Sequence, residues 1–118
     1  MIRFINCMRR KAELTPDQFR QFWNDPRFTV LIERVASFTG AARYAKSATL
    51  IVPANALVKE ARGTRDPYDG VLEYWWDNAA HLIERVENPA GRELAEEMLT
   101  FQSQFIDLPA STAFFVEG

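Results

Sequence analysis

TPDQFRQFWNDPRFTVLIERVASFTG, residues 15–40, is the stretch of sequence that decides the fold of this chain. Its first half predicts a well-capped amphipathic helix. Thr15 can accept hydrogen bonds from the first free amides, Pro16 suits the first helical position, and Gln18 completes a capping box. Aromatic residues at i, i+3 and i+4 then give the helix one apolar stripe for a core, made of Phe19, Phe22 and Trp23.

The predicted helix is interrupted at the dipeptide Asp25-Pro26. Pro26 lacks a backbone donor and biases Asp25 away from helical angles, so the helix axis must kink or stop there. A second apolar stripe resumes after the break, and Gly40 closes it in the way typical of a helix C-terminus. The members of this second stripe are Leu31, Ile32, Val35 and Phe38. When a helix is interrupted just after an aromatic stripe, we expect its broken end to border a cavity.

Length and composition predict a single globular domain over residues 1–118. The 118 residues are 47% apolar and 25% charged, which are ordinary values for globular proteins. A net charge of -2 gives no general reason to expect a nucleic-acid partner. The apolar runs fall short of the ~18 residues that a membrane span needs, so no membrane partner is expected. Because no signal peptide precedes the first strand, the reducing cytoplasm is the expected compartment.

Cysteine and histidine each occur once, as Cys7 and His81. A single cysteine forms no internal disulfide, and one residue of each type does not suit a typical zinc site. His81 falls at the edge of its predicted helical stripe, so we expect it in solvent. The sequence contains neither a phosphate-binding loop nor a dinucleotide fingerprint. The residues therefore predict no metal site.

The chain on both sides of the broken helix alternates between predicted strands and helices. Asp77 is expected to cap one further helix with a stripe at Ala79, Leu82, Ile83 and Val86. Asn88 is expected to cap the next, with Pro89 at its first position and a stripe at Leu94, Met98, Phe101 and Phe105. The predicted strands are Ile2–Met8, Arg43–Val52, Val71–Trp76 and Thr112–Val116. The order β-α-β-β-α-β, with the second helix doubled, predicts an α+β ferredoxin-like fold with a four-stranded antiparallel sheet.

The predicted strands carry apolar residues on both faces, as in Ile2–Met8, where Phe4 and Met8 share one face and Ile5 and Cys7 the other. The helices of this fold cover only one face of the sheet. The other face would leave a large apolar patch in a monomer. We therefore expect a homodimer that pairs sheet to sheet around a barrel-like core.

Four segments together resemble the EthD-domain family of the dimeric α+β barrel superfamily. They are the opening strand, TPDQFRQFW at residues 15–23, DGVLEYWWD at residues 69–77, and the tail FIDLPASTAFFVEG. The resemblance covers nearly the whole chain, apart from residues 53–69. It implies a homodimer with a small-molecule cleft between each sheet and its helices, working without metal or organic cofactor. Related proteins include ether-degradation proteins, a muconolactone methylisomerase, and fungal decarboxylases or dehydratases that act on aromatic polyketides.

The sequence departs from this family at one informative position. Members commonly place a histidine four residues after the Tyr-Trp or Phe-Trp pair, where this chain has Arg27. Arginine stays protonated near neutral pH and cannot act as an ordinary general base. It can instead hold a carboxylate, phenolate or enolate through paired hydrogen bonds. The alternative is a surface arginine bonded to Asp25 or Glu33.

Polar and aromatic side chains elsewhere complete the predicted ligand site. Asn6 shares a strand face with Phe4 and Met8, and its amide needs a hydrogen-bonding partner, which is a ligand, the backbone or a neighbouring side chain. Tyr44 has small neighbours, so its phenol either donates to a substrate carbonyl or belongs to a core tyrosine with an exposed tip.

The consecutive residues Trp75 and Trp76 must face opposite sides of their strand, one toward the helices and one toward the partner. Which indole faces which side stays open at this point. Aromatic walls suit a planar ligand, although core packing is the alternative. The predicted ligand-binding set is Asn6, Trp23, Arg27, Tyr44 and Trp76, without an assigned catalytic residue.

The seventeen residues Pro53–Asp69 form a long insertion between paired strands, with a short helix expected over Ala54–Ala61 and ended by Gly63. Either a solvated loop or a lid over the cleft fits this segment. Two functions fit the whole chain. One is a cofactor-independent lyase, isomerase or dehydratase that acts on a hydrophobic carbonyl, lactone or phenolic compound. The other is a non-catalytic dimeric protein that binds a metabolite of a degradation pathway.

Overall fold

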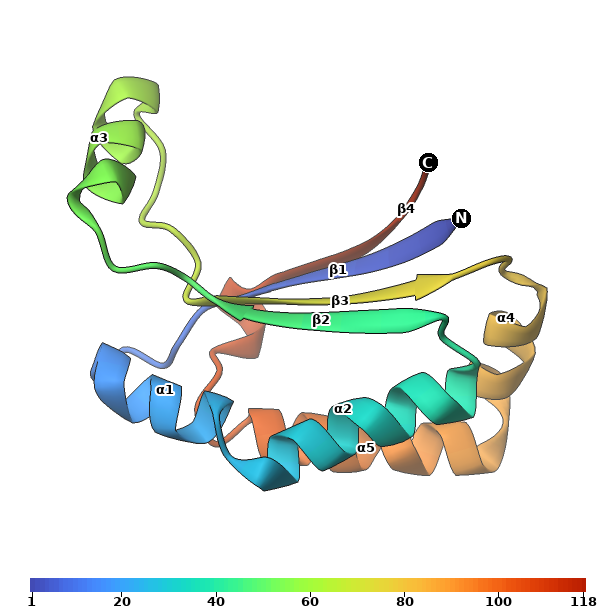
Figure 1. Cartoon of the computed structure of the whole chain (residues 1–118). Coiled ribbons are helices and arrows are strands. Elements are labelled where there is room, and N and C mark those ends of the chain that lie inside the picture. Colours follow the sequence, from blue (N-terminus) through green and yellow to red (C-terminus); the bar gives the residue numbers. More distant parts are fainter.

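Four strands form one antiparallel sheet in the spatial order β2-β3-β1-β4 (Figure 1). The structure is a computed structural model that describes the backbone of residues 1–118 and every side chain except that of His81, so the expected exposure of His81 lies outside the described residues. The strands are β1 (Ile2–Met8), β2 (Arg43–Ala48), β3 (Gly70–Trp76) and β4 (Thr112–Glu117). The predicted four-stranded antiparallel sheet of an α+β fold is confirmed.

Four of the five α-helices pack on one face of this sheet, and the remaining one projects on the opposite side (Figure 1). The packed helices are α1 (Pro16–Trp23), α2 (Pro26–Thr39), α4 (Ala80–Glu87) and α5 (Pro89–Gln102). The projecting helix is α3 (Pro53–Arg62), and a short 3-10 turn at Leu108–Ala110 precedes β4.

The break in the opening helix follows from local backbone chemistry. The Thr15 hydroxyl accepts from the Gln18 amide at 3.1 Å, and the Gln18 side chain accepts from the Thr15 amide at 2.9 Å, which is the predicted capping box. α1 ends at Trp23, and Asp25 starts α2 by accepting from the Arg27 amide at 2.8 Å. Gly40 ends α2 at a φ of 73°, a left-handed conformation that favours glycine.

Two sequence predictions about element ends are wrong. β2 ends at Ala48, four residues before the predicted Val52, because the chain there leaves the sheet toward α3. Asp77 does not cap α4, whose N-cap is Ala79 and makes no side-chain hydrogen bond. The predicted cap of α5 is confirmed, since the Asn88 side chain accepts from the Ala90 amide at 2.8 Å.

The predicted stripes differ in how deeply they are buried. The α5 stripe is buried as expected. On α4, Leu82 is buried, whereas Ile83 and Val86 are 59% and 46% exposed.

Aromatic rings fill the space between helices and sheet at the end where β1 finishes and β3 begins. The ring of Phe28 lies 5.4 Å from that of Trp23 and 5.5 Å from that of Phe105. Phe19 stacks on Trp23 at 5.4 Å. These four side chains are almost completely buried. Aromatic packing therefore dominates this end of the core.

Trp23 packs against the backbone of β3 at Gly70. A Cβ atom added to Gly70 would lie 2.6 Å from the Trp23 ring, closer than real Cβ atoms approach. The Lys46 ammonium on β2 donates to the Trp23 carbonyl at 2.5 Å and lies 5.9 Å from the centre of the Trp23 ring. The last residue of α1 is thus fixed to two strands at the point where the helix breaks.

We expect Gly70→Ala to lower the free energy of unfolding by about 1–3 kcal/mol, because the new methyl group overlaps the Trp23 ring. Urea denaturation of Gly70→Ala, Trp23→Phe and the double variant provides the measurement. The smaller ring of Trp23→Phe should make room for the methyl group, so the loss in the double variant should be less than the sum of the single losses. Strictly additive losses would show that the two residues do not meet.

Candidate functional site

A cavity of about 260 Å³ lies at the other end of the helix–sheet space. Its floor is the helix-facing surface of the sheet, with Phe4 from β1 and the buried side chains Leu72 and Tyr74 from β3. Its walls come from the second half of α2, from Val86 of α4, and from one face of α5. The cavity therefore sits between the sheet and the helices, where the family resemblance predicts a cleft.

The mouth of the cavity opens beside α5. Val86 and Leu99 line the cavity and are also 46% and 49% exposed. Two other lining residues of α5, Leu94 and Met98, are buried. An apolar molecule can thus enter beside Val86 and Leu99 and lose contact with water once it is inside.

Two polar groups at the cavity already have partners within the protein. The Thr39 hydroxyl donates to the Val35 carbonyl at 2.7 Å and accepts from the Trp76 indole at 3.1 Å. The Tyr74 hydroxyl donates to the Ile32 carbonyl at 3.4 Å. Burial raises the pKa of Tyr74 far above its ordinary value of 10.0, so the phenol stays protonated at neutral pH. Both hydroxyls therefore donate hydrogen bonds to backbone carbonyls of the protein itself.

Two side-chain amides at the cavity have no such partner. Asn6 on β1 and Gln102 at the end of α5 both line the cavity, and neither side chain makes a hydrogen bond to the described part of the chain. Gln102 is only 3% exposed. Neither amide is among the fully buried polar atoms that lack a partner, so both keep access to solvent or to the cavity space. The two amides bring polar groups to a mostly apolar cavity, where they can donate to and accept from a bound molecule.

Asn6 is the one member of the predicted ligand set that lines this cavity. Arg27 lies outside it, with its side chain 73% exposed, and forms an ion pair of 2.7 Å with Asp25. The guanidinium Nε also donates to both Asp25 oxygens at 3.2 Å. This is the surface pairing that the sequence left as the alternative for Arg27, whose role in ligand binding stays a prediction.

Tyr44 also lies away from the cavity, on the edge strand β2. Its hydroxyl donates to a Glu33 carboxylate oxygen at 3.0 Å. This hydrogen bond, together with burial, raises the pKa of Tyr44. The geometry ties the phenol to α2, so its predicted contact with a substrate carbonyl stays a prediction.

The two predicted tryptophans are core residues. Trp23 is 1% exposed within the aromatic cluster, and Trp76 is 4% exposed beneath α2. Because the Trp76 indole donates to Thr39, Trp76 is the indole that faces the helices. Trp76 does not line the cavity, but it contacts two residues that do, because it donates to Thr39 and stacks on Tyr74 at 5.8 Å between ring centres. The structure therefore does not bring Asn6 together in one site with the other residues of the predicted ligand-binding set, which are Trp23, Arg27, Tyr44 and Trp76.

Sequence reasoning missed Gln102, although a signal was present. Gln102 lies eight residues after Leu94 and four after Met98, so it falls on the apolar stripe of α5. A polar residue at a core-facing position requires either a protein partner or a ligand. This position is informative because Gln102 lines the same cavity as Asn6, and that depends on the folded arrangement.

The described lining residues can hold a molecule but carry no acid or base that titrates near neutral pH. Their polar groups are the amides of Asn6 and Gln102 and the hydroxyls of Thr39 and Tyr74. Such groups stabilise a carbonyl, phenol or developing oxyanion by hydrogen bonding. Among the described residues, no group of three or more His, Cys, Asp or Glu side chains gathers as metal ligands would.

A comparison with protein-family models identifies the family of this chain. The EthD domain model matches residues 11–104, which is most of the sequence. The chain belongs to the EthD family. No curated protein matches the sequence of this EthD protein significantly. The comparison confirms the resemblance drawn from the strand and helix motifs.

Solved structures share the fold of this EthD protein at low sequence identity. A dimeric ferredoxin-like protein of unknown function from Bacteroides fragilis has a TM-score of 0.62 at 9% identity, over 99% of this chain and 95% of that one. An EthD family protein from Bacillus halodurans has a TM-score of 0.60 at 12% identity, with 100% and 98% covered. SnoaB, a cofactor-independent oxygenase from Streptomyces nogalater, has a TM-score of 0.54 at 12% identity, with 99% and 91% covered. The ferredoxin-like fold is thereby confirmed.

The helices of the EthD chain were also compared with the length and apolar character that a membrane span requires. Within the described residues, none of them is long and apolar enough to cross a bilayer.

The Asp25–Arg27 pair predicts a specific pH dependence. Hydrogen bonds from Arg27 lower the pKa of Asp25, so the ionised carboxylate stabilises the folded state above its unfolded pKa of about 4. This contribution is lost as the pH falls through the lowered pKa. We therefore expect the melting temperature of the wild type to fall more steeply below pH 5 than that of Asp25→Asn, which keeps an amide cap but carries no charge.

Melting curves at half-unit pH steps down to about pH 2.5 make this comparison. Asp66 and Glu97, whose pKa values are also lowered by ion pairs, are present in both proteins and cancel in the difference. Parallel curves would show that Arg27 does not hold the Asp25 carboxylate in solution and is available to other anions.

Proposed function

We propose that the protein binds a small, mostly apolar molecule that carries a carbonyl, lactone or phenolic oxygen. The observation that carries this proposal is the pair of unpartnered amides, Asn6 and Gln102, at the wall of an apolar cavity. The apolar part of the ligand would lie against Leu72 and Met98. Its oxygen would accept from or donate to the two amides, which make no hydrogen bond to the described part of the chain.

The size of the cavity limits the ligand. An engineered cavity of about 150 Å³ takes up benzene. The 260 Å³ of this cavity therefore suits a compound of one or two fused rings. Larger polycyclic compounds would need to extend through the mouth beside Leu99.

Catalysis without a cofactor is the second candidate, and the amide pair favours it as well. Amides that point at a substrate oxygen stabilise negative charge that develops there during enolisation, elimination or isomerisation. SnoaB, described as a cofactor-independent oxygenase, shares the fold. The lyase, isomerase or dehydratase predicted from the sequence fits this chemistry, and a non-catalytic metabolite-binding protein of a degradation pathway is the alternative. The cytoplasm stays the expected compartment.

We also propose that the protein is a homodimer joined through the sheet face opposite the helices. This outer face carries Ile5, Val71 and Phe114 from three adjacent strands, and no described α-helix packs on it (Figure 1). Phe114 is 45% exposed. A second copy would bury this apolar surface from water. Proteins of the same fold are described as dimeric, which supports the proposal.

Arginines at one end of this outer face support the same interface. Trp75 lies there with the Arg43 guanidinium 3.9 Å and the Arg3 guanidinium 5.8 Å from its ring centre. The Arg3 Nε is buried without a hydrogen-bond partner in the described part of the chain. Glu73 lies on the same face. A two-fold interface that brings carboxylates and guanidiniums together would satisfy this donor.

The matched pair 1-indanone and indane tests the amide pair, because the two compounds share a ring system and differ by a carbonyl oxygen. We expect Asn6→Ala and Gln102→Leu each to weaken binding of 1-indanone by about threefold to tenfold more than binding of indane. Titrations followed by ligand-detected NMR give both dissociation constants.

Arg27→Ala and Tyr44→Phe are the controls, since both residues lie outside the cavity. They should leave the binding of both compounds unchanged. If these controls weaken binding and the amide variants do not, the ligand site lies at the sequence-predicted residues instead. Turnover of a lactone and phenol panel by the wild type then separates an enzyme from a binding protein.

An aspartate substitution in the proposed interface, compared with one on a control surface, tests the dimer. Val71→Asp places a charge in the proposed interface, whereas Val30→Asp places it on the exposed surface of α2, where Val30 is 53% exposed. We expect Val71→Asp to raise the dimer dissociation constant by about tenfold or more, and Val30→Asp to leave it unchanged. Sedimentation velocity over a concentration series measures both. A wild type that is monomeric at micromolar concentration would refute the dimer.

A further inference from the structure

Helix α3 leaves the body of the protein on the side of the uncovered sheet face. It rises from the end of the sheet where β2 finishes and β3 begins, on the side opposite α1, α2, α4 and α5 (Figure 1). None of its residues is buried. The cavity lies on the helix side of the sheet, so α3 does not cover it. The alternative of a lid over this cavity is therefore wrong.

The projecting helix carries an apolar stripe of which no residue is buried in its own chain. Small and apolar residues recur at i, i+3, i+4 and i+7, as Ala54, Leu57, Val58 and Ala61. Leu57 is 66% and Val58 52% exposed. The segment that leads into the helix adds Leu50 and Ile51, which are 67% and 69% exposed.

A helix of this length needs a packing partner to be stable. α3 has ten residues, and isolated helices shorter than about 12–15 residues are marginal in water. The C-terminal cap at Gly63, whose φ is 65°, fixes where the helix ends but buries no apolar surface. The stabilisation of α3 must come largely from covering the stripe.

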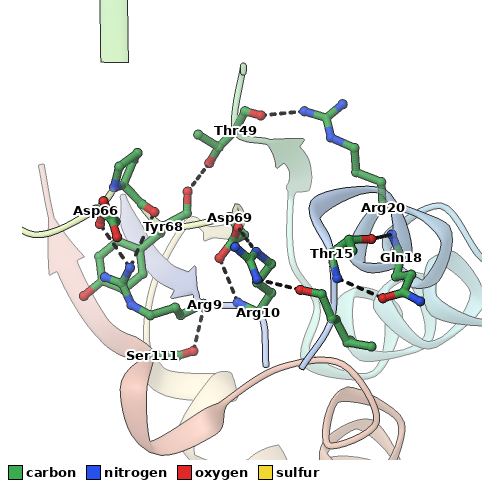
Figure 2. A network of polar contacts seen from close by, with 12 residues as sticks. Arg9, Arg10, Thr15, Gln18, Arg20, Thr49, Asp66, Tyr68, Asp69 and Ser111 are labelled. Carbon is green, nitrogen blue, oxygen red and sulfur yellow. Dashed lines mark hydrogen bonds and ion pairs between the residues drawn. The ribbon is translucent and has the colours of Figure 1, made fainter. Parts of the chain in front are cut away.

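Polar contacts join the segments before and after α3 to the rest of the protein, as Figure 2 shows. In the segment that follows α3, Asp69 pairs with Arg10 at 3.3 Å, and the Arg9 guanidinium donates to the Asp66 carbonyl at 3.0 Å. In the segment that precedes α3, the Thr49 carbonyl accepts from Arg20 of α1 at 2.5 Å.

These contacts on both sides of the base keep α3 pointing away from its own sheet. The Arg9 guanidinium also lies 4.4 Å from the centre of the Tyr68 ring, and the Thr49 hydroxyl donates to the Tyr68 carbonyl. Close to α3 itself, the Lys59 ammonium lies 2.5 Å from an Asp66 carboxylate oxygen. The segments on either side of α3 are therefore tied to the body of the protein, while α3 itself has no buried residue.

We propose that α3 is an arm that packs its apolar stripe, centred on Leu57 and Val58, against a second copy of this chain. This inference rests on the homodimer proposed above. The arm rises on the same side as the outer sheet face, so a second copy seated on that face comes within reach of it, and the stripe continues the interface. In a two-fold dimer each arm holds the other subunit, so the contact occurs twice.

The test compares two double variants of the full-length protein. Leu57→Ser/Val58→Ser removes the stripe, and Glu60→Ser/Arg62→Ser makes the same number of serine substitutions on exposed polar positions of α3 without changing the net charge. We expect the first variant to raise the dimer dissociation constant by about tenfold or more and the second to change it less than about twofold. Sedimentation velocity measures the constants, and far-UV circular dichroism checks the fold.

Photo-crosslinking supplies a second measurement that works even for a very tight dimer. A benzophenone amino acid at position 57 should give a covalent dimer, and the same group at position 60 should give far less. Equal dissociation constants for both double variants, together with equal crosslinking, would overturn the arm while leaving the sheet-to-sheet dimer standing. A wild type that stays monomeric would refute the dimer and the arm together.

Discussion

The close packing of Trp23 on Gly70 determines how the helices lie on the sheet. Only a residue without a side chain lets the indole reach the backbone of β3, and Lys46 then binds the carbonyl that α1 leaves free at its end. The chain turns at this point and starts α2 from the Asp25 cap. Aromatic rings are therefore concentrated at one end of the helix–sheet space. The cavity lies at the other end, where aliphatic side chains and two amides line it together with the rings of Phe4, Phe38 and Tyr74.

The two faces of the sheet carry separate roles in this account. The face toward the helices holds the aromatic core and the cavity with Asn6 and Gln102. The outer face and the arm α3 present apolar side chains on one side of the molecule (Figure 1). A second copy on the outer face would leave the cavity mouth beside Leu99 open. Ligand binding and dimerisation can thus be altered independently.

Much of the fold was predictable because it depends on contacts between residues close in sequence. The capping box at Thr15, the Asn88 cap and the break at Pro26 involve neighbours within a few positions. The site was harder to predict, because it depends on residues that the fold brings together from distant segments. Arg27 illustrates the limit, since an apparent ligand for a substrate anion is paired with the carboxylate two residues before it.

Gln102 shows the opposite case, a site residue that the pattern hid among core positions. Its significance comes from lining the same cavity as Asn6, and these two residues come from opposite ends of the chain. A crystal structure of the protein soaked with 1-indanone tests this pairing most directly. We expect the ring to lie between the sheet and α5, with the carbonyl oxygen within about 3.2 Å of the Asn6 or Gln102 amide nitrogen. A ligand bound at Arg27 or Tyr44, with the cavity empty, would contradict it.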